Sequence, residues 1–281
     1  MPTFLVAQGC GKERVINDGR AGEQNEWSEM LETIFTISVD FLAVAAHEIL
    51  DAIRIIWTKL DRGAPLEALQ AALPEWCELR FSLDDIPDAY NGVPVLPEHA
   101  RGNIIALWSP ETQQWMYVAQ QGLGFGLMSA VPTFCRSPTL ATAASRRVFC
   151  TASGAYFDDC PVVEVAAEAS TGQQCLQAVL SFTGTESSAE KALTPAPARV
   201  FLGTACQLGT AVSEGYVEFS PKTTTISKIR DGVQLAIKTR KLTVATANSL
   251  RGQNGMGQFE HFWPSGQSVQ LEPERVDQIS R

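Results

Sequence analysis

Two adjacent aspartates, Asp158 and Asp159, lie between two mainly apolar segments within residues 154–165. The residues around them predict a strand, an acidic turn and a second strand. Paired carboxylates repel each other when nothing offsets their charge, so a pair between two apolar strands requires solvent or a cation beside it. A lone Asp-Asp pair can also be an ordinary solvated turn. In either case the pattern restricts this part of the chain to a hairpin with charge at its tip.

A second acidic cluster follows another predicted strand. Apolar residues alternate over 77–83, which is typical of a strand with one buried face, and Asp84 and Asp85 come directly after them. Magnesium prefers oxygen ligands and usually keeps several waters, so two or three aspartates are sufficient to hold it. Two such ions stabilise both the attacking and the leaving oxygen of a phosphoryl transfer. Carboxylates at two strand ends therefore indicate metal-dependent phosphoryl transfer.

The rest of the pattern mixes strands with helices. Residues 28–60 and 129–149 have helical periodicity, and Pro138 predicts a break in the second of these helices because proline removes a donor and crowds the preceding turn. Segments 103–108 and 115–119 flank a polar turn and predict a hairpin. Further helical patterns lie at 171–182 and 223–251, and a short strand is predicted at 200–208.

Charge is distributed unevenly along the 281 residues. Residues 1–80 have 7 basic and 13 acidic groups, residues 81–190 have 4 and 11, and residues 191–281 have 11 and 7, which gives −6, −7 and +4 and a total of −9. This balance excludes a protein whose whole surface binds nucleic acid, because phosphates require clustered Lys and Arg. Seven basic residues within 222–251 would either line one nucleic-acid channel or cover a solvated helix face.

Cysteine usage and hydropathy limit the compartment. The seven cysteines are scattered singly, without a C-x-x-C pair, which indicates reduced thiols. The first ten residues lack a secretory signal. The apolar stretch 34–57 contains Asp40, Glu48 and Asp51, which a membrane span would have to bury. We therefore expect an intracellular protein, cytoplasmic or nuclear, without a membrane partner.

Five ordered motifs resemble those of one enzyme family. The string AYFDD at 155–159 is similar to a Y-x-D-D motif, and DIPDAY at 85–90 is similar to D-x-x-x-A-[YF]. Between them, QGLGFGLMSAVPTF resembles a glycine-rich turn that enters a helix, while GKERVINDGR and ARVFLG resemble an upstream and a downstream element. In this order they resemble reverse transcriptases of retrotransposon and retroviral type. The resemblance covers about residues 11–205, and more weakly 223–251.

The resemblance implies a set of metal ligands and a nucleotide pocket. Asp85 and Asp158 would bridge two Mg²⁺ ions, for which Mn²⁺ can substitute, with Asp159 beside them and the Ile86 carbonyl as a further ligand. Tyr90 would be a steric gate that excludes a 2′-hydroxyl. Its alternative is a half-buried core tyrosine.

Triphosphate and template contacts follow from the same comparison. Lys12 and Arg14 would bind the triphosphate, Arg as a planar fork and Lys as a point charge. Gly124, Phe125 and Gly126 would form the floor beneath the template base, since glycine allows close backbone approach. In isolation, Lys12 and Arg14 are ordinary surface residues and a single Gly-x-Gly is weak evidence.

Two further elements carry implied roles. Lys191 lies where the family often has a lysine that protonates the departing pyrophosphate, a general-acid role. Phe201, Leu202 and Gly203 match the element that holds the primer end.

The implied fold is α+β in a right-hand polymerase arrangement, with an antiparallel palm sheet backed by helices and with partial fingers and thumb. Residues 1–80 would be partial fingers, residues 81–205 the palm with a fingers insertion at about 92–122, and residues 206–281 a thumb-like or connection segment. Pro161 departs from the pattern, because a proline in the strand after the acidic turn cannot donate to a ladder, and it predicts a distorted or edge strand.

The predicted activity is template-directed addition of deoxynucleotides to a primer 3′-hydroxyl, with RNA or DNA as template and deoxynucleoside triphosphates as substrates. The missing ribonuclease H pattern implies a fragment of a longer polyprotein. One alternative is a catalytically silent retroelement remnant or a domesticated nucleic-acid-binding protein. Another is an unrelated metal-binding protein whose acidic turns mimic the motifs. The oligomeric state stays open.

Overall fold

The computed structural model describes residues 1–7, 13–28, 33–60, 77–168, 170–242, 247 and 269–270. The chain forms two compact units. The first unit contains residues 1–36, 83–161 and 173–193, and the second contains residues 37–82, 162–172 and 194–281. The fold is mixed α/β with antiparallel hairpins and sheets, as the sequence predicted.

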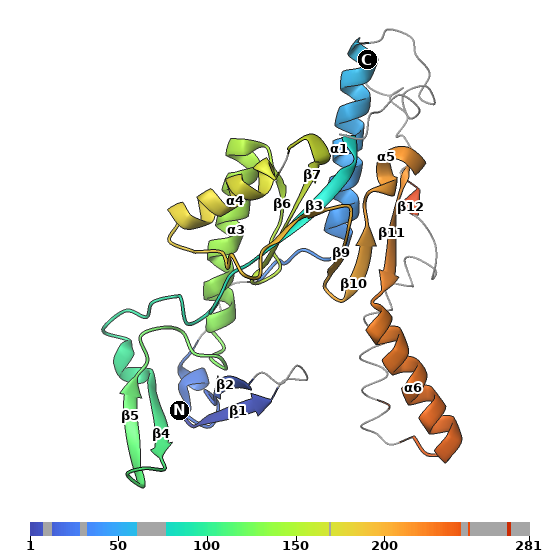
Figure 1. Cartoon of the computed structure of the whole chain (residues 1–281). Coiled ribbons are helices and arrows are strands. Elements are labelled where there is room, and N and C mark those ends of the chain that lie inside the picture. Colours follow the sequence, from blue (N-terminus) through green and yellow to red (C-terminus); the bar gives the residue numbers. More distant parts are fainter. Residues whose placement is uncertain are drawn as a thin grey trace. The chain divides into compact units, whose positions relative to one another are not determined.

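A four-stranded sheet holds both acidic segments. Its strand order is β6 (Ala152–Ser153), β7 (Asp159–Val165), β3 (Leu79–Asp85) and β8 (Leu193–Ala196), and Figure 1 shows β6, β7 and β3 side by side. In β3, Leu79 and Phe81 are fully buried as the alternation predicted, but Ser82 and Asp84 on the other face are also buried, and Leu83 is half-buried. The strand then ends at Asp85, beside the start of β7.

The prediction of a distorted or edge strand at Pro161 is wrong. Strand β7 lies between β6 and β3, and the Pro161 carbonyl accepts a hydrogen bond from the Gly154 amide at 3.1 Å. In an antiparallel pair one residue directs its N–H and its C=O to the same neighbour. The donor that Pro161 lacks would therefore face the short β6 side, so the ladder toward β3 loses nothing.

Helix α3 (Ala130–Phe149) follows the glycine-rich segment, and it runs without interruption through Pro138. The predicted break there is wrong. A proline inside a helix costs about 3 kcal/mol, but here its ring is buried, together with Phe134 and Ala141 on the same face. The Thr142 hydroxyl also donates to the Pro138 carbonyl at 2.9 Å. Packing of this face outweighs the lost backbone bond.

Helix α4 (Thr171–Phe182) matches its predicted range. It buries Leu176 and Leu180, which lie one turn apart on one face. After α4 the chain passes through residues 183–192 to reach β8, and this connection carries Lys191.

Two small hairpins complete the first unit. Strand β1 (Thr3–Ala7) pairs with β2 (Glu13–Asn17), and β4 (Ile104–Ser109) pairs with β5 (Gln114–Ala119), which confirms the predicted hairpin there. The Met1 amino group donates to the Ile104 carbonyl at 2.6 Å and joins the two hairpins. Short 3₁₀ turns lie at η1 (Gln24–Trp27) and η3 (Ala100–Gly102) in this unit, and at η4 (Ala166–Glu168) in the second unit.

Among its described residues, the second unit contains a sheet of its own and three helices. The strand order is β12 (Val269–Gln270), β11 (Tyr216–Pro221), β10 (Thr204–Gln207) and β9 (Ala198–Phe201). The strand predicted at 200–208 is therefore two strands joined by a tight turn. The helices are α1 (Asp40–Leu60), α5 (Thr210–Glu214) and α6 (Thr223–Thr239).

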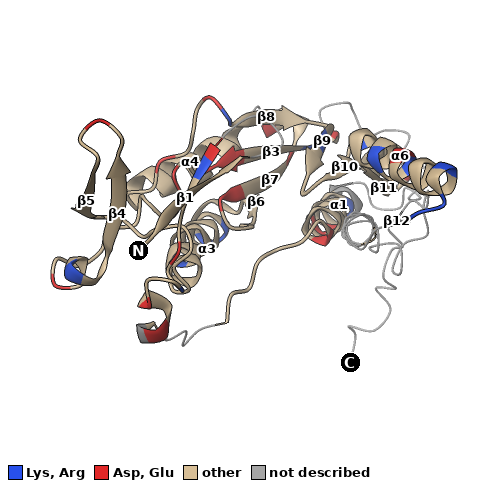
Figure 2. Cartoon of the chain, turned by 90° about the horizontal axis from the view of Figure 1, so that it is seen from below, with Lys and Arg blue, Asp and Glu red and all other residues tan. Residues whose placement is uncertain are grey.

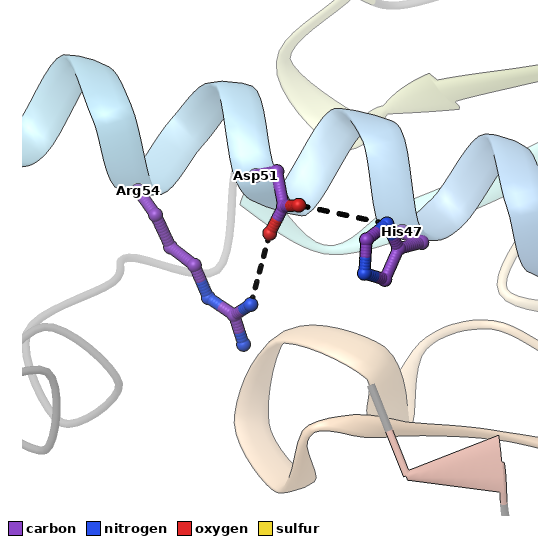
Figure 3. A network of polar contacts seen from close by, with 3 residues as sticks. All are labelled: His47, Asp51 and Arg54. Carbon is purple, nitrogen blue, oxygen red and sulfur yellow. Dashed lines mark hydrogen bonds and ion pairs between the residues drawn. The ribbon is translucent and has the colours of Figure 1, made fainter. Parts of the chain in front are cut away.

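Helix α1 confirms the predicted helix at 28–60 only from Asp40 onward, because residues 33–38 are not helical. It buries Leu42, Ala46 and Leu50 on one face. The helix also carries a network of polar contacts (Figure 3). The Asp51 carboxylate lies 3.5 Å from the His47 imidazole and 3.0 Å from the Arg54 guanidinium. Such pairs stabilise a helix by about 0.2–0.5 kcal/mol each. No helix among the described residues is both long and apolar enough to cross a membrane.

Candidate active site

The acidic pair lies at the tip of the hairpin between β6 and β7. Tyr156 and Asp159 exchange both backbone hydrogen bonds, at 2.8 and 3.0 Å, so Phe157 and Asp158 form a two-residue turn. Phe157 has a φ of 51°, a left-handed conformation that bulky residues seldom adopt. Positive φ at this position matches the twist of the two strands. The predicted strand, acidic turn and strand are thereby confirmed.

Strand β3 delivers Asp85 to the same turn. The Ile86 amide donates to the Asp158 carbonyl at 3.0 Å, which joins the two acidic segments through their backbones. The Asp85 carboxylate forms an ion pair with the Lys191 ammonium, with Oδ2 and Nζ 2.6 Å apart. The Ser188 amide also donates to the Asp85 carbonyl at 2.8 Å. Of the predicted residues, the structure thus brings Asp85, Ile86, Asp158, Asp159 and Lys191 together.

The electrostatics of this group reflect crowded negative charge. Burial and the charges of Asp158 and Asp85 together raise the pKa of Asp159 from its ordinary 3.8 to about 6, against the opposing effect of Lys191. The hydrogen bond to Asp85 raises the pKa of Lys191 and keeps the ammonium charged. The neighbouring Cys160 thiol is buried, which raises its pKa strongly. One ammonium therefore faces several carboxylates.

The three aspartates fit a divalent cation in donor type and in charge. Carboxylate oxygens are the ligands that Mg²⁺ prefers, and after burial the charges of Asp158 and Asp85 are the causes that raise the pKa of Asp159. Among the residues that the structure describes, no three His, Cys, Asp or Glu side chains are gathered as a ready metal-ligand group. Asp85 directs one oxygen to Lys191 instead.

Aromatic rings lie next to the acidic group. The Tyr90 ring meets Phe125 at 4.8 Å and Phe134 at 5.4 Å between centroids, both edge-on. The Arg14 guanidinium lies over the Phe125 ring, 5.1 Å from its centroid, a favourable cation–π contact. Burial raises the pKa of the Tyr90 hydroxyl, with Cys135 and Asp158 as further causes. The structure therefore brings Tyr90, Phe125 and Arg14 together as one layer.

Phe134 is part of this layer but sequence reasoning did not single it out as a site residue. It is buried on α3 and belongs to that helix's apolar face. Its helical periodicity was visible in the sequence, but periodicity does not tell which buried ring touches Tyr90.

The glycine-rich segment closely approaches the end of β2. A Cβ on Gly126, where φ is 106°, would overlap the Asn17 carbonyl oxygen, and one on Gly124 would overlap the Asn17 side-chain amide. The backbone amide of Asn17 also donates to the Phe125 carbonyl at 2.8 Å. Asn17 thus seats the predicted floor residues, a role that sequence reasoning missed. Lys12 lies outside the described residues.

The predicted primer element lies in the second unit. Phe201 ends β9, and Leu202 and Gly203 form the turn to β10. Phe201 is buried, and Leu202 and Gly203 have φ values of 49° and 78°. In the same unit, α6 carries several of the basic residues counted in the sequence, and Figure 2 shows them as blue segments along the helix. No residue of α6 is buried. The helical prediction for 223–251 is confirmed over 223–239, and most of 243–250 lies outside the described residues.

Comparison with known proteins places the fold. No model of a known protein family matches the sequence, and no curated protein matches it. Among solved structures, the chain is similar to the foamy viral protease-reverse transcriptase dRH in complex with double-stranded DNA, with a TM-score of 0.56 and 15% identity over 92% of this chain. It is also similar to a second structure of the foamy viral protease-reverse transcriptase in complex with double-stranded DNA, with a TM-score of 0.55 and 14% identity over 90% of this chain. The chain spans 36% and 42% of the length of those two proteins. The fold is therefore like that of a reverse transcriptase.

Proposed function

We propose that the chain is the polymerase core of a reverse transcriptase of retrotransposon or retroviral type. The observation that carries this proposal is the junction of the Asp158–Asp159 turn with the end of β3. That junction brings together two acidic motifs that are far apart in the sequence, at the ends of the neighbouring strands β3 and β7. The likeness of the whole fold to a reverse transcriptase supports the same activity class.

The proposed reaction adds a deoxynucleotide to a primer 3′-hydroxyl and releases pyrophosphate. Asp85 and Asp158 would hold two Mg²⁺ ions, with the Ile86 carbonyl and Asp159 beside them. The metal site would supply charge stabilisation for the attacking and leaving oxygens. Mn²⁺ is expected to substitute.

The chain's own side chains would orient the nucleotide. Arg14 would bind the triphosphate with its planar fork, and its position over Phe125 holds it at the edge of the aromatic layer. The Tyr90 ring would pack under the sugar and exclude a 2′-hydroxyl. Gly124, Phe125 and Gly126 would support the templating base. Lys191, whose hydrogen bond to Asp85 keeps it protonated, would give its proton to the departing pyrophosphate.

In unit two, Phe201, Leu202 and Gly203 would hold the primer end, and basic α6 would contact the nucleic-acid backbone as part of a thumb-like segment. Phosphate neutralisation by Lys and Arg makes such contacts strongly dependent on salt. RNA or DNA would serve as template.

The second candidate is a catalytically silent remnant that binds nucleic acid. One observation favours it: Lys191 occupies an oxygen of Asp85, and no three-residue ligand group is assembled among the described residues. In that case template binding would persist without turnover.

Primer extension tests the choice. The purified chain is incubated with poly(rA)/oligo(dT), dTTP and Mg²⁺ or Mn²⁺, and compared with the double variant Asp158→Asn, Asp159→Asn. We expect the double variant to lose at least about 1,000-fold in rate, because several kcal/mol of charge stabilisation disappear. The control Glu98→Gln, Glu111→Gln removes two charges from exposed positions and should keep the activity. A folded wild-type chain that binds primer–template but never extends it would favour the silent remnant.

A further inference from the structure

Two consecutive aspartates of β3 lie on opposite faces of the sheet. Successive side chains of a strand alternate between faces, so Asp84 and Asp85 point apart. Asp85 faces the acidic turn and Lys191, whereas Asp84 is completely buried. A buried carboxylate is costly unless it is hydrogen-bonded, and a hydrocarbon side chain would avoid that cost. Asp84 therefore requires a reason of its own.

Helix α4 supplies the partners of Asp84. Gln177 and Gln173 each donate one Nε2 hydrogen to the Asp84 Oδ1, at 2.7 and 3.3 Å respectively. The two glutamines lie four residues apart, so they share one face of the helix. Gln177 makes the shorter of the two bonds. The carboxylate thereby holds both amide groups in fixed positions.

Gln173 differs from Gln177 in a second contact. Its Nε2 also donates to the Leu193 carbonyl at 3.2 Å, so both hydrogens of this amide are used. Gln173 is itself buried. It therefore joins Asp84 in β3 to the residue at which the 183–192 connection ends.

The middle of this connection, at Ser188, is fixed at the active site. Ser188 donates its amide to the Asp85 carbonyl at 2.8 Å, and the Lys191 and Ala192 amides both donate to the Ser188 carbonyl. Lys191 thus lies in a tight turn with one anchor at Ser188 and another two residues later, at Leu193. The distance from its ammonium to Asp85 depends on both anchors.

We propose that Gln173, held by the buried Asp84, is a positioning residue that anchors the Leu193 end of this turn and so determines where the Lys191 ammonium lies against Asp85. The catalytic part of this inference rests on the proposed function. Its structural part does not, because the anchors are hydrogen bonds of the folded chain. Gln177 provides a matched comparison, since it shares the helix face and the carboxylate but not the Leu193 contact.

Methionine substitutions test the kinetic consequence. Gln173→Met and Gln177→Met each remove an amide donor while keeping the length of the side chain. We expect Gln173→Met to lower kcat for dTTP addition about tenfold with little change in KM, since misplacing a catalytic group by 1 Å can cost about 100-fold. Gln177→Met should leave kcat within about threefold, although it removes the shorter bond to Asp84. In a Lys191→Ala background the effect of Gln173→Met should nearly vanish, because residues that act through one another are not additive.

Amide hydrogen exchange tests the anchor without any catalysis. In Gln173→Met, the Ser188, Lys191 and Ala192 amides should exchange about tenfold faster than in the wild type, because a released anchor allows local opening. In Gln177→Met their rates should stay near those of the wild type. Unchanged rates in Gln173→Met, or equal changes in both variants, would overturn the proposal. If the wild type extends no primer, the exchange result still decides the anchor, and only the proposed function fails.

Discussion

Two tight turns, one in each unit, hold a bulky residue in the left-handed conformation. In the turn between β6 and β7 this residue is Phe157, with a φ of 51°, and in the turn between β9 and β10 it is Leu202, with a φ of 49°. In the second turn Gly203 also has positive φ, as expected of a hairpin turn with two left-handed residues. The corresponding position of the first turn is Asp158, whose φ is not positive, so the two turns share a left-handed residue only at their first position.

The two turns share a left-handed first residue but differ in their second residue. In the second turn glycine takes one of the unusual conformations at no steric cost. In the first turn no glycine is present, and the tip instead carries a carboxylate beside a second one at Asp159. Non-glycine residues in this region cost about 1–3 kcal/mol and cluster at functional sites. The first turn accepts both steric and electrostatic cost, which is consistent with the metal-binding role proposed for it.

The largest stability effect is expected from the charge of the first turn. Because the folded state raises the pKa of Asp159 from 3.8 to about 6, it binds this proton more tightly than the unfolded state. The contribution of Asp159 to stability should therefore be fully present below pH 3.8, be lost as the pH rises toward 6, and stay absent above it. Asp159→Asn should remove part of this loss, less than about 3 kcal/mol, since one pKa unit corresponds to about 1.4 kcal/mol and solvent screens this half-buried carboxylate.

Urea unfolding at several pH values, in the presence of EDTA, measures this effect. The control Glu218→Gln removes an exposed carboxyl from β11 in the other unit and should leave the profile close to that of the wild type. Identical profiles for the wild type and Asp159→Asn would mean that the first turn carries no electrostatic cost.

A smaller effect is expected from the glycine of the second turn. Gly203→Ala places a Cβ at a φ of 78° and should lower the free energy of unfolding by about 1–2 kcal/mol. Gly102→Ala is the matched control, because a Cβ there meets nothing within 4 Å. Thermal unfolding of both variants checks the difference. Equal stabilities would show that the second turn tolerates side chains at both positions.

The smallest effect separates the two bulky residues. Leu202→Asn produces the sequence that hairpin turns of this type prefer, and it should stabilise the chain by about 0.5–1 kcal/mol. Phe157→Asn relieves the same conformation but loses the edge contact with the Tyr156 ring, 4.8 Å between centroids, which is worth about 0.5–1.5 kcal/mol. It should therefore give no net gain. Chemical denaturation of the two variants, measured in parallel, would contradict this account if both were stabilised equally.

Local patterns predicted most of the elements near the site. The alternating segment before Asp84, the apolar residues around Asp158 and the polar turn after residue 108 each gave the correct strand or hairpin. These predictions succeeded because the periodicity of side-chain burial depends on the order of neighbouring residues in the sequence. The predicted domain limits and the roles of the site residues stay predictions.

The two proline predictions failed for one shared reason. Pro138 and Pro161 each lack a donor, which the sequence shows, but the cost depends on what surrounds them. Pro138 is buried on the packed face of α3, and the donor that Pro161 lacks would face the two-residue strand β6. A propensity states a local cost, and tertiary packing decided whether it was offset.

The sequence by itself determined which residues carry charge and where the chain turns, and the ordered acidic motifs alone were sufficient to indicate a reverse-transcriptase-like fold. Only the tertiary structure decided which of these residues meet. Lys191 reaches Asp85 across 106 residues of sequence, and Gln173 reaches Asp84 across 89. Contacts at such separations leave no periodic trace, because they depend on how strands and helices pack rather than on the spacing of neighbours along the chain.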